Sequence, residues 1–329
     1  MLKRRSSHIL LALLFMMLPV AAQIDDPIKV DSAVVRLNVG VVDGRGRPII
    51  NLGRSDFTLY ENGQKQEIVS FETSSAPFSV MLLLDMSGST KSFRQNIALS
   101  ASRFLDALGP QDRVAVAEFN NKTKLLNDFT TDRRRAAFSI SVANGQGPTE
   151  LYQALDFAIG RLAAEKSARK AIVVLSDGVD TSLQNADRAR LTDIPDENVP
   201  TTLKPDENET LNRILEAADK LGVTIYPLAL PTGDPARLAD PTPRQVAMYT
   251  AARERLQIVA DRTGGTLNAI RRLEEMGRLY AEVAADMRTL YTIEYSPSDL
   301  TRDGKWRSIK VEVNQESLIT RTRQGYFAK

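Results

Sequence analysis

The stretch SVMLLLDMSGST (79–90) decides the fold, because a continuous apolar run ends in an aspartate and a serine-rich loop. Such a run is typical of a strand that is buried on both faces of a parallel sheet. Apolar residues then recur every three or four positions from Phe93 to Leu108, which predicts a helix directly after the loop. Strand, loop and helix in this order form the first unit of an alternating α/β domain.

The same alternation continues along the chain. AIVVLSD (171–177) and VTIYPLAL (223–230) are further apolar strands, and helical periodicity separates them. RVAVAEF (113–119) and TKLLNDF (123–129) are close enough to form an antiparallel pair. We therefore predict a doubly wound, mostly parallel, Rossmann-like sheet with helices on both faces. The carboxyl ends of its strands share one edge, where such folds bind ligands.

Both ends of this α/β region have strand character instead. An N-terminal segment, 23–77, contains the hairpin signal Asn62-Gly63, and alternating residues return in a C-terminal segment, 291–329. Each segment has too few strands to be stable alone. We therefore predict an α/β domain over 78–290, flanked by one β-rich unit that the two segments build together.

Residues 1–22 have the pattern of a signal peptide. Three basic residues precede an apolar run from Ile9 to Leu18, and small residues follow before Gln23. The run is short for a bilayer span, although an uncleaved anchor is the alternative. No later stretch is apolar enough to span a membrane. We therefore expect an exported protein, periplasmic or secreted, with no membrane span after cleavage.

Composition excludes several kinds of chemistry. The chain has no cysteine, and its single histidine, His8, lies in the predicted signal peptide. A mature chain without either residue has no Ser-His-Asp or Cys-His catalysis and no zinc site built from Cys or His. Cleavage removes three of 43 basic residues and leaves 40 against 41 acidic ones. This balance gives no support for nucleic-acid binding.

Oxygen-bearing side chains gather where strands end. Asp85, Ser87 and Ser89 alternate after the first apolar strand, Thr149 lies in a glycine-rich loop before a helix, and Asp177 ends a second strand. Carboxylates and hydroxyls converging on one point suit a hard cation such as Mg²⁺. The structural alternative is that Asp85, the serines and Thr149 cap helices and that Asp177 forms a turn.

Together these five residues resemble the metal-ion-dependent adhesion site of the von Willebrand factor type A domain. The resemblance covers about 78–290, and the segments outside it resemble exported bacterial proteins with a related core between β-rich ends. It implies that Ser87, Ser89 and Thr149 bind Mg²⁺, Mn²⁺ or Ca²⁺ directly. Asp85 and Asp177 would act largely through water. The remaining position would go to an Asp or Glu carboxylate of a protein partner.

This resemblance favours a non-enzymatic, cation-dependent binding module. One alternative is a Mg²⁺-dependent phosphotransferase, but such enzymes generally need a second aspartate where this chain has Ser87. Another is a structural subunit whose metal braces the loops. We also expect Asp180 to be a solvated loop residue. Two long stretches, 181–210 and 231–251, are predicted to be insertions that wall the metal site and select its ligand. The alternative is that they are flexible surface loops.

Overall fold

The computed structural model describes residues 34–167 and 169–328, so the predicted signal peptide lies outside the described residues. Within them, the apolar runs form a six-stranded sheet whose strands are all parallel except β7, which pairs antiparallel with β6 at the edge. In spatial order the strands are β10 (Asn268–Ala269), β9 (Val223–Ala229), β8 (Arg169–Ser176), β5 (Phe78–Asp85), β6 (Arg113–Phe119) and β7 (Thr123–Thr130). The predicted doubly wound fold and the antiparallel pair at its edge are confirmed.

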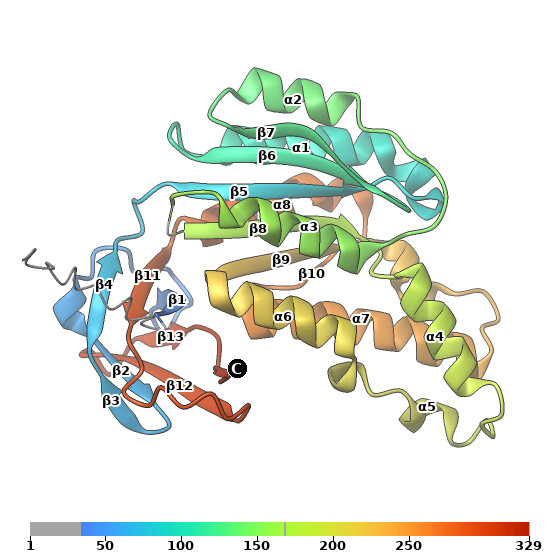
Figure 1. Cartoon of the computed structure of the whole chain (residues 1–329). Coiled ribbons are helices and arrows are strands. Elements are labelled where there is room, and N and C mark those ends of the chain that lie inside the picture. The colour runs from blue at the N-terminus through green and yellow to red at the C-terminus, as the bar shows by residue number, and fades with distance from the viewer. Residues whose placement is uncertain (1–33, 168, 329) are drawn as a thin grey trace, which may run out of the picture. The chain divides into compact units, whose positions relative to one another are not determined.

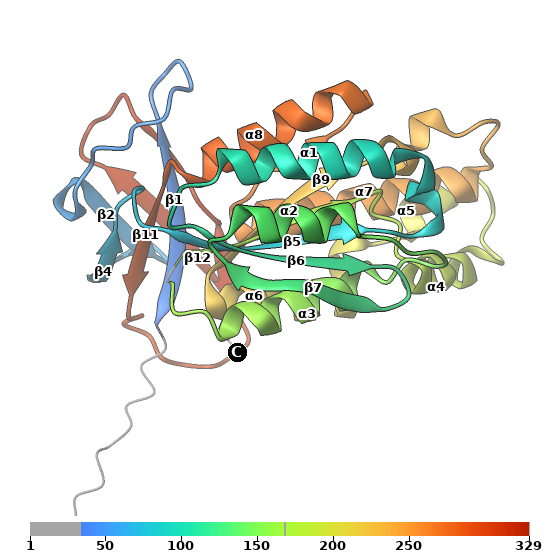
Figure 2. The same ribbon diagram turned by 90° about the horizontal axis from the view of Figure 1, so that it is seen from above.

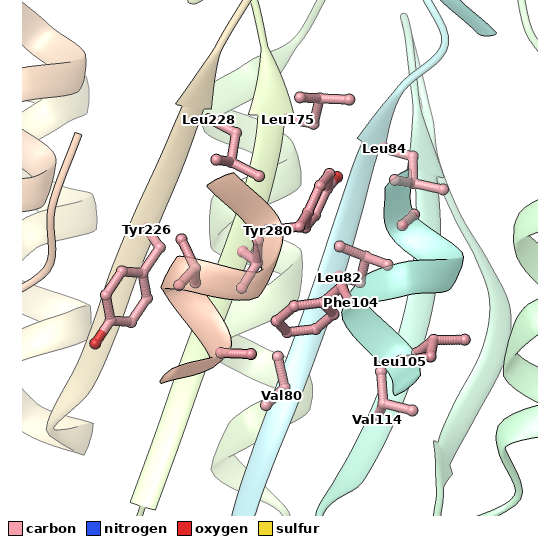
Figure 3. Packing of buried hydrophobic residues seen from close by; sticks show 14 of the residues in the cluster. Val80, Leu82, Leu84, Phe104, Leu105, Val114, Leu175, Tyr226, Leu228 and Tyr280 are labelled. Carbon is pink, nitrogen blue, oxygen red and sulfur yellow. The ribbon is translucent and has the colours of Figure 1, made fainter. Parts of the chain in front are cut away.

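Helices cover both faces of this sheet (Figures 1 and 2). One face carries α1 (Arg94–Ala107), α2 (Arg133–Ser141) and α8 (Met276–Met287). The other carries α3 (Leu151–Ala163), α6 (Glu209–Leu221) and α7 (Pro243–Thr263). Figure 3 shows the first face, where apolar side chains of four neighbouring strands lie beneath Phe104 of α1 and Tyr280 of α8. Both faces of β5 are buried, as its uninterrupted apolar sequence requires.

The two terminal segments form two four-stranded sheets that share one apolar core. The first sheet has the order β13 (Ile319–Arg321), β1 (Val35–Val42), β11 (Leu290–Tyr295) and β4 (Ile68–Glu72). The second has the order β14 (Gly325–Phe327), β12 (Trp306–Val313), β2 (Phe57–Glu61) and β3 (Gln64–Gln66). Asn62 and Gly63 join β2 to β3 with positive φ angles of 49° and 78°, as the hairpin signal predicts. The predicted flanking β-rich unit is therefore present.

Arg169 connects the α/β domain to the β-rich unit through hydrogen bonds. It is fully buried at the first position of β8, and its guanidinium donates to the carbonyls of Ser74 at 2.7 Å, Met287 at 2.7 Å and Leu290 at 2.9 Å. The guanidinium also lies 3.9 Å from the centre of the Phe78 ring. A buried cation is tolerated here because carbonyl oxygens surround it.

The two long stretches contain helices, so they are not the flexible surface loops of the alternative interpretation. That they wall the metal site stays a prediction. The first contains α4 (Thr181–Leu191) and α5 (Val199–Thr202), and α7 begins within the second, at Pro243. A proline at the first helical position is favourable, and Thr242 and Gln245 complete a capping box there. These helices bury a small core of their own, formed by Leu191, Val199, Leu203, Met248 and Ala251. No helix in the described part of the chain is long and apolar enough to cross a membrane.

Candidate functional site

The predicted site residues lie at the carboxyl edge of the six-stranded sheet. β5 ends at Asp85 and its neighbour β8 ends at Ser176, one residue before Asp177. This edge is the one farther from the β-rich unit (Figures 1 and 2). The two aspartates thus come from adjacent strands, as the parallel arrangement predicts.

Asp85 is fully buried and held on both carboxylate oxygens. Oδ1 accepts from the backbone N–H of Ser87 at 2.9 Å, and Oδ2 accepts from the hydroxyl of Ser176 at 2.7 Å. Burial, and then the nearby negative charge of Asp177, raises the pKa of Asp85 to about 6. Two carboxylates in a buried place repel each other, and such a place attracts a cation.

The serine loop turns its hydroxyls toward each other. Ser87 Oγ and Ser89 Oγ lie 3.1 Å apart, and neither the 3₁₀ helix Gly88–Phe93 nor α1 has a side-chain cap. Thr90 fixes the loop by donating to the carbonyls of Asp85 at 2.8 Å and Ser87 at 3.0 Å. The structural alternative, in which these serines cap the next helix, is therefore not what the loop shows.

The glycine-rich loop before α3 brings Thr149 to the same edge. The N–H of Gly88 donates to the carbonyl of Gly147 at 3.1 Å, which joins this loop to the serine loop. At Gly145 a Cβ atom would lie 2.8 Å from the carbonyl oxygen of Met86, so the close approach requires glycine. Thr149 is not the N-cap of α3, since Glu150 occupies that position.

Asp177 is nearly buried in the turn after β8. Its Oδ1 accepts from the N–H of Val179 at 3.1 Å, so the predicted role in a turn is real. Its Oδ2 accepts a longer hydrogen bond, 3.3 Å, from Thr232. Thr232 belongs to the 3₁₀ turn Pro231–Gly233 after β9, which brings a third strand end to the site. This role in the turn does not exclude a role in a cation site, because a carboxylate oxygen has more than one acceptor direction.

The donor set fits a small hard cation. Three hydroxyls and two carboxylates supply oxygen only, and adjacent ligands of an Mg²⁺ octahedron lie about 3 Å apart, close to the separation of the two serine oxygens. No group of three or more Asp, Glu, His or Cys side chains suited to a metal occurs among residues 34–167 and 169–328. A cation at this edge would thus depend on the hydroxyls.

Most of the predicted ligands are buried, and one expectation about this region needs correction. Asp85, Ser87, Thr149 and Asp177 are all buried, while Ser89 is exposed. Asp180 is not a solvated loop residue. It is buried as the N-cap of α4, where it accepts from the N–H of Leu183 at 3.0 Å and from that of Tyr152 at 3.3 Å.

Sequence reasoning also missed residues that position the site. Ser176 holds Asp85 in place, and Thr181 accepts from the N–H of Thr149 at 3.0 Å. Arg253 is half-buried in α7 and interacts electrostatically with Asp234 and Asp177. One of its buried guanidinium nitrogens has no hydrogen-bond partner. The position of Ser176 directly before Asp177 was a usable signal. Nothing local marks Arg253, because 76 residues separate it from Asp177.

Residues 80–179 match the family model of the von Willebrand factor type A domain. The vWF domain of the type V pili tip protein Mfa5 from Porphyromonas gingivalis is 16% identical, over 64% of this chain and 94% of that one, with a TM-score of 0.47. A von Willebrand factor type A structure from Catenulispora acidiphila is 10% identical, over 91% and 74%, also with a TM-score of 0.47.

The PilB minor pilin from Streptococcus sanguinis is 14% identical, over 65% of this chain and 62% of that one, with a TM-score of 0.43. Comparison with curated protein sequences gives no match. The family-model match runs from β5 to the turn after β8 and includes all five predicted ligands. Over residues 80–179 the chain is thus similar to the von Willebrand factor type A domain family.

Proposed function

We propose that this protein is an exported, divalent-cation-dependent protein-binding module for adhesion or assembly. The observation that carries the proposal is the pairing of a buried, repelled carboxylate with two hydroxyl oxygens 3.1 Å apart at the ligand edge of the sheet. Export rests on the signal pattern of residues 1–22, and it makes a periplasmic or secreted location our proposal as well.

In this proposal Ser87, Ser89 and Thr149 hold Mg²⁺, or Mn²⁺ or Ca²⁺, through their hydroxyls. Asp85 and Asp177 orient bound water and balance the charge. Two carboxylates neutralise one divalent ion, so the site stays able to attract a third carboxylate from an Asp or Glu of a partner. Ser89 is the exposed member of the set, which makes its side the approach route for that partner.

A binding role is better supported than phosphoryl transfer. A phosphotransferase of the kind considered above needs a carboxylic acid two residues after its nucleophile, to donate a proton. Ser87 occupies that position, and its hydroxyl faces Ser89. A serine hydroxyl has no accessible pKa for general acid catalysis near neutral pH.

Calorimetry with Mg²⁺ and Mn²⁺ tests the cation site. We expect the mature protein to bind one ion, and Asp85→Asn or the double variant Ser87→Ala/Ser89→Ala to lose measurable binding. Asp106→Asn, which neutralises an exposed carboxylate of α1, is the control and should bind as the wild type does. Equal affinity in Asp85→Asn and wild type would contradict the assignment.

Partner capture from the native envelope, with and without a chelator, then separates a binding module from a metal-braced structural subunit. Capture that needs the cation supports the proposal. Capture that is the same in chelator, by a protein that binds Mg²⁺, would instead favour the bracing role.

A further inference from the structure

A pocket of about 700 Å³ lies directly beside the candidate cation site. Phe93, at the end of the 3₁₀ helix after the serine loop, forms one wall, and the Pro231–Gly233 turn forms another. Thr232 in that turn donates to Asp177 at 3.3 Å, so one residue lines the pocket and contacts a proposed ligand. A group bound in the pocket is therefore a neighbour of any group bound at the cation.

Three arginines give this pocket a positive charge. Its lining includes Arg237, Arg271 and Arg272, against a single acid, Glu274. We call these three residues the arginine pocket. Phe93 and Leu273 add apolar surface to the same lining, which suits the methylene stem of an acidic side chain.

The structure positions these arginines without fully neutralising them. Arg237 donates to the carbonyl of Arg271 at 2.7 Å, which ties the turn after β9 to the loop before α8, while Asp234 is 3.7 Å away. Arg272 pairs with Glu275 at 3.2 Å, but its side chain stays 77% exposed. Arg271 is an exposed residue and makes no ion pair with the described residues. Arginine binds carboxylates through two parallel hydrogen bonds, so these groups are suited to an acidic ligand.

We propose that the arginine pocket binds a second carboxylate of the same ligand, so the partner presents two acidic residues close together in one segment. This inference rests on the proposed function, because the first carboxylate has to be at the cation. An isolated Asp or Glu on a partner surface satisfies the cation but leaves the arginines unused. A pair of acids engages both and excludes partners that offer only one, which is how such a site gains specificity.

Short Gly/Ser peptides test this proposal on the mature protein. One set carries two Glu separated by one, two or three residues, and a matched set has one Glu replaced by Gln. In Mg²⁺ we expect at least one two-acid spacing to bind about tenfold more tightly than its one-acid match, as one added charge-assisted contact would give. The double variant Arg271→Gln/Arg272→Gln should abolish that ratio and keep the Mg²⁺ affinity. Arg134→Gln, an exposed arginine of α2, is the control and should keep the ratio.

The outcomes separate this inference from the proposed function. Mg²⁺ binding together with equal affinities for one-acid and two-acid peptides overturns the arginine pocket alone. A two-acid preference that survives in the double variant also overturns it. A wild type that binds no Mg²⁺ in calorimetry overturns the proposed function and, with it, the two-point ligand.

Discussion

At the scale of the residue, Asp85 illustrates how a buried carboxylate opposes stability. A carboxylate that is buried beside a second one costs free energy unless a cation or a proton compensates it. The two hydrogen bonds that Asp85 accepts offset part of this cost, and still its pKa stays near 6. The fold thus tolerates a carboxylate whose charged form it destabilises.

This cost predicts that Asp85→Asn stabilises the metal-free protein. A pKa raised from 3.8 to about 6 corresponds to about 3 kcal/mol of destabilisation at pH 7. The sign follows because the folded state binds the proton more tightly than the unfolded state does. The wild type therefore loses stability as pH rises from about 4 to about 6, and the neutral amide does not.

Chemical denaturation in EDTA at pH 4 and pH 7 checks this prediction. Asp85→Asn and wild type should be similar at pH 4, and the variant should be the more stable protein at pH 7. Asp106→Asn should follow the wild type at both values. A variant that is less stable at pH 7 would show that the two hydrogen bonds of Asp85 outweigh its burial.

At the scale of the element, α4 is a helix that the apolar pattern of the sequence did not predict. Within α4 the buried residues are Asp187 and Leu191, so the helix has little apolar periodicity to detect. Its partner is Arg255 of α7, which makes two hydrogen bonds to Asp187 at 2.7 and 2.8 Å in a pair that is almost fully buried. A salt bridge between residues 68 apart carries no local signal.

The buried pair predicts an asymmetric response to mutation. Asp187→Ala leaves the guanidinium of Arg255 buried without its partner, so we expect a loss of about 3–5 kcal/mol in the free energy of unfolding. Asp187→Leu/Arg255→Met removes both charges at similar volume and should cost less. Urea denaturation of the single and double variants decides this. A double variant that is less stable than Asp187→Ala would mean that the pair is a net source of stability.

The same pair changes how the ligand-selecting role of the long stretches can be tested. Replacing residues 185–208 with a short linker would remove Asp187 and leave Arg255 buried without its partner. A loss of partner binding could then result from misfolding as well as from lost recognition. Point substitutions of exposed side chains avoid this problem. That the stretches select the ligand remains a prediction.

At the scale of the whole molecule, the sequence was sufficient to predict the elements whose pattern is local or repeats along the chain. Buried parallel strands must be apolar throughout, so 79–85, 171–177 and 223–230 were recognisable, and the sheet edge brought Asp85 and Asp177 together. The start of α7 was missed because Pro243 is equally compatible with a loop and with the first turn of a helix. The arginine pocket was missed because Arg237 and Arg271 meet only through tertiary folding.

The β-rich unit is discontinuous in sequence, which predicts that it unfolds as one body. β11 lies between β1 and β4, and Ile293 in its centre is fully buried, opposite Leu37 and Phe71. Ile293→Asp would bury an unpaired charge in the shared core and should cost several kcal/mol. We expect amides of β1, β2, β4 and β12 to lose hydrogen-exchange protection together, while the six-stranded sheet stays protected and Mg²⁺ binding persists. Ile319→Asp is the matched control, because that side chain in β13 is 60% exposed and should leave protection unchanged. If β4 kept its protection while β11 opened, the two terminal segments would be independent, and the discontinuous unit would not be the body that unfolds.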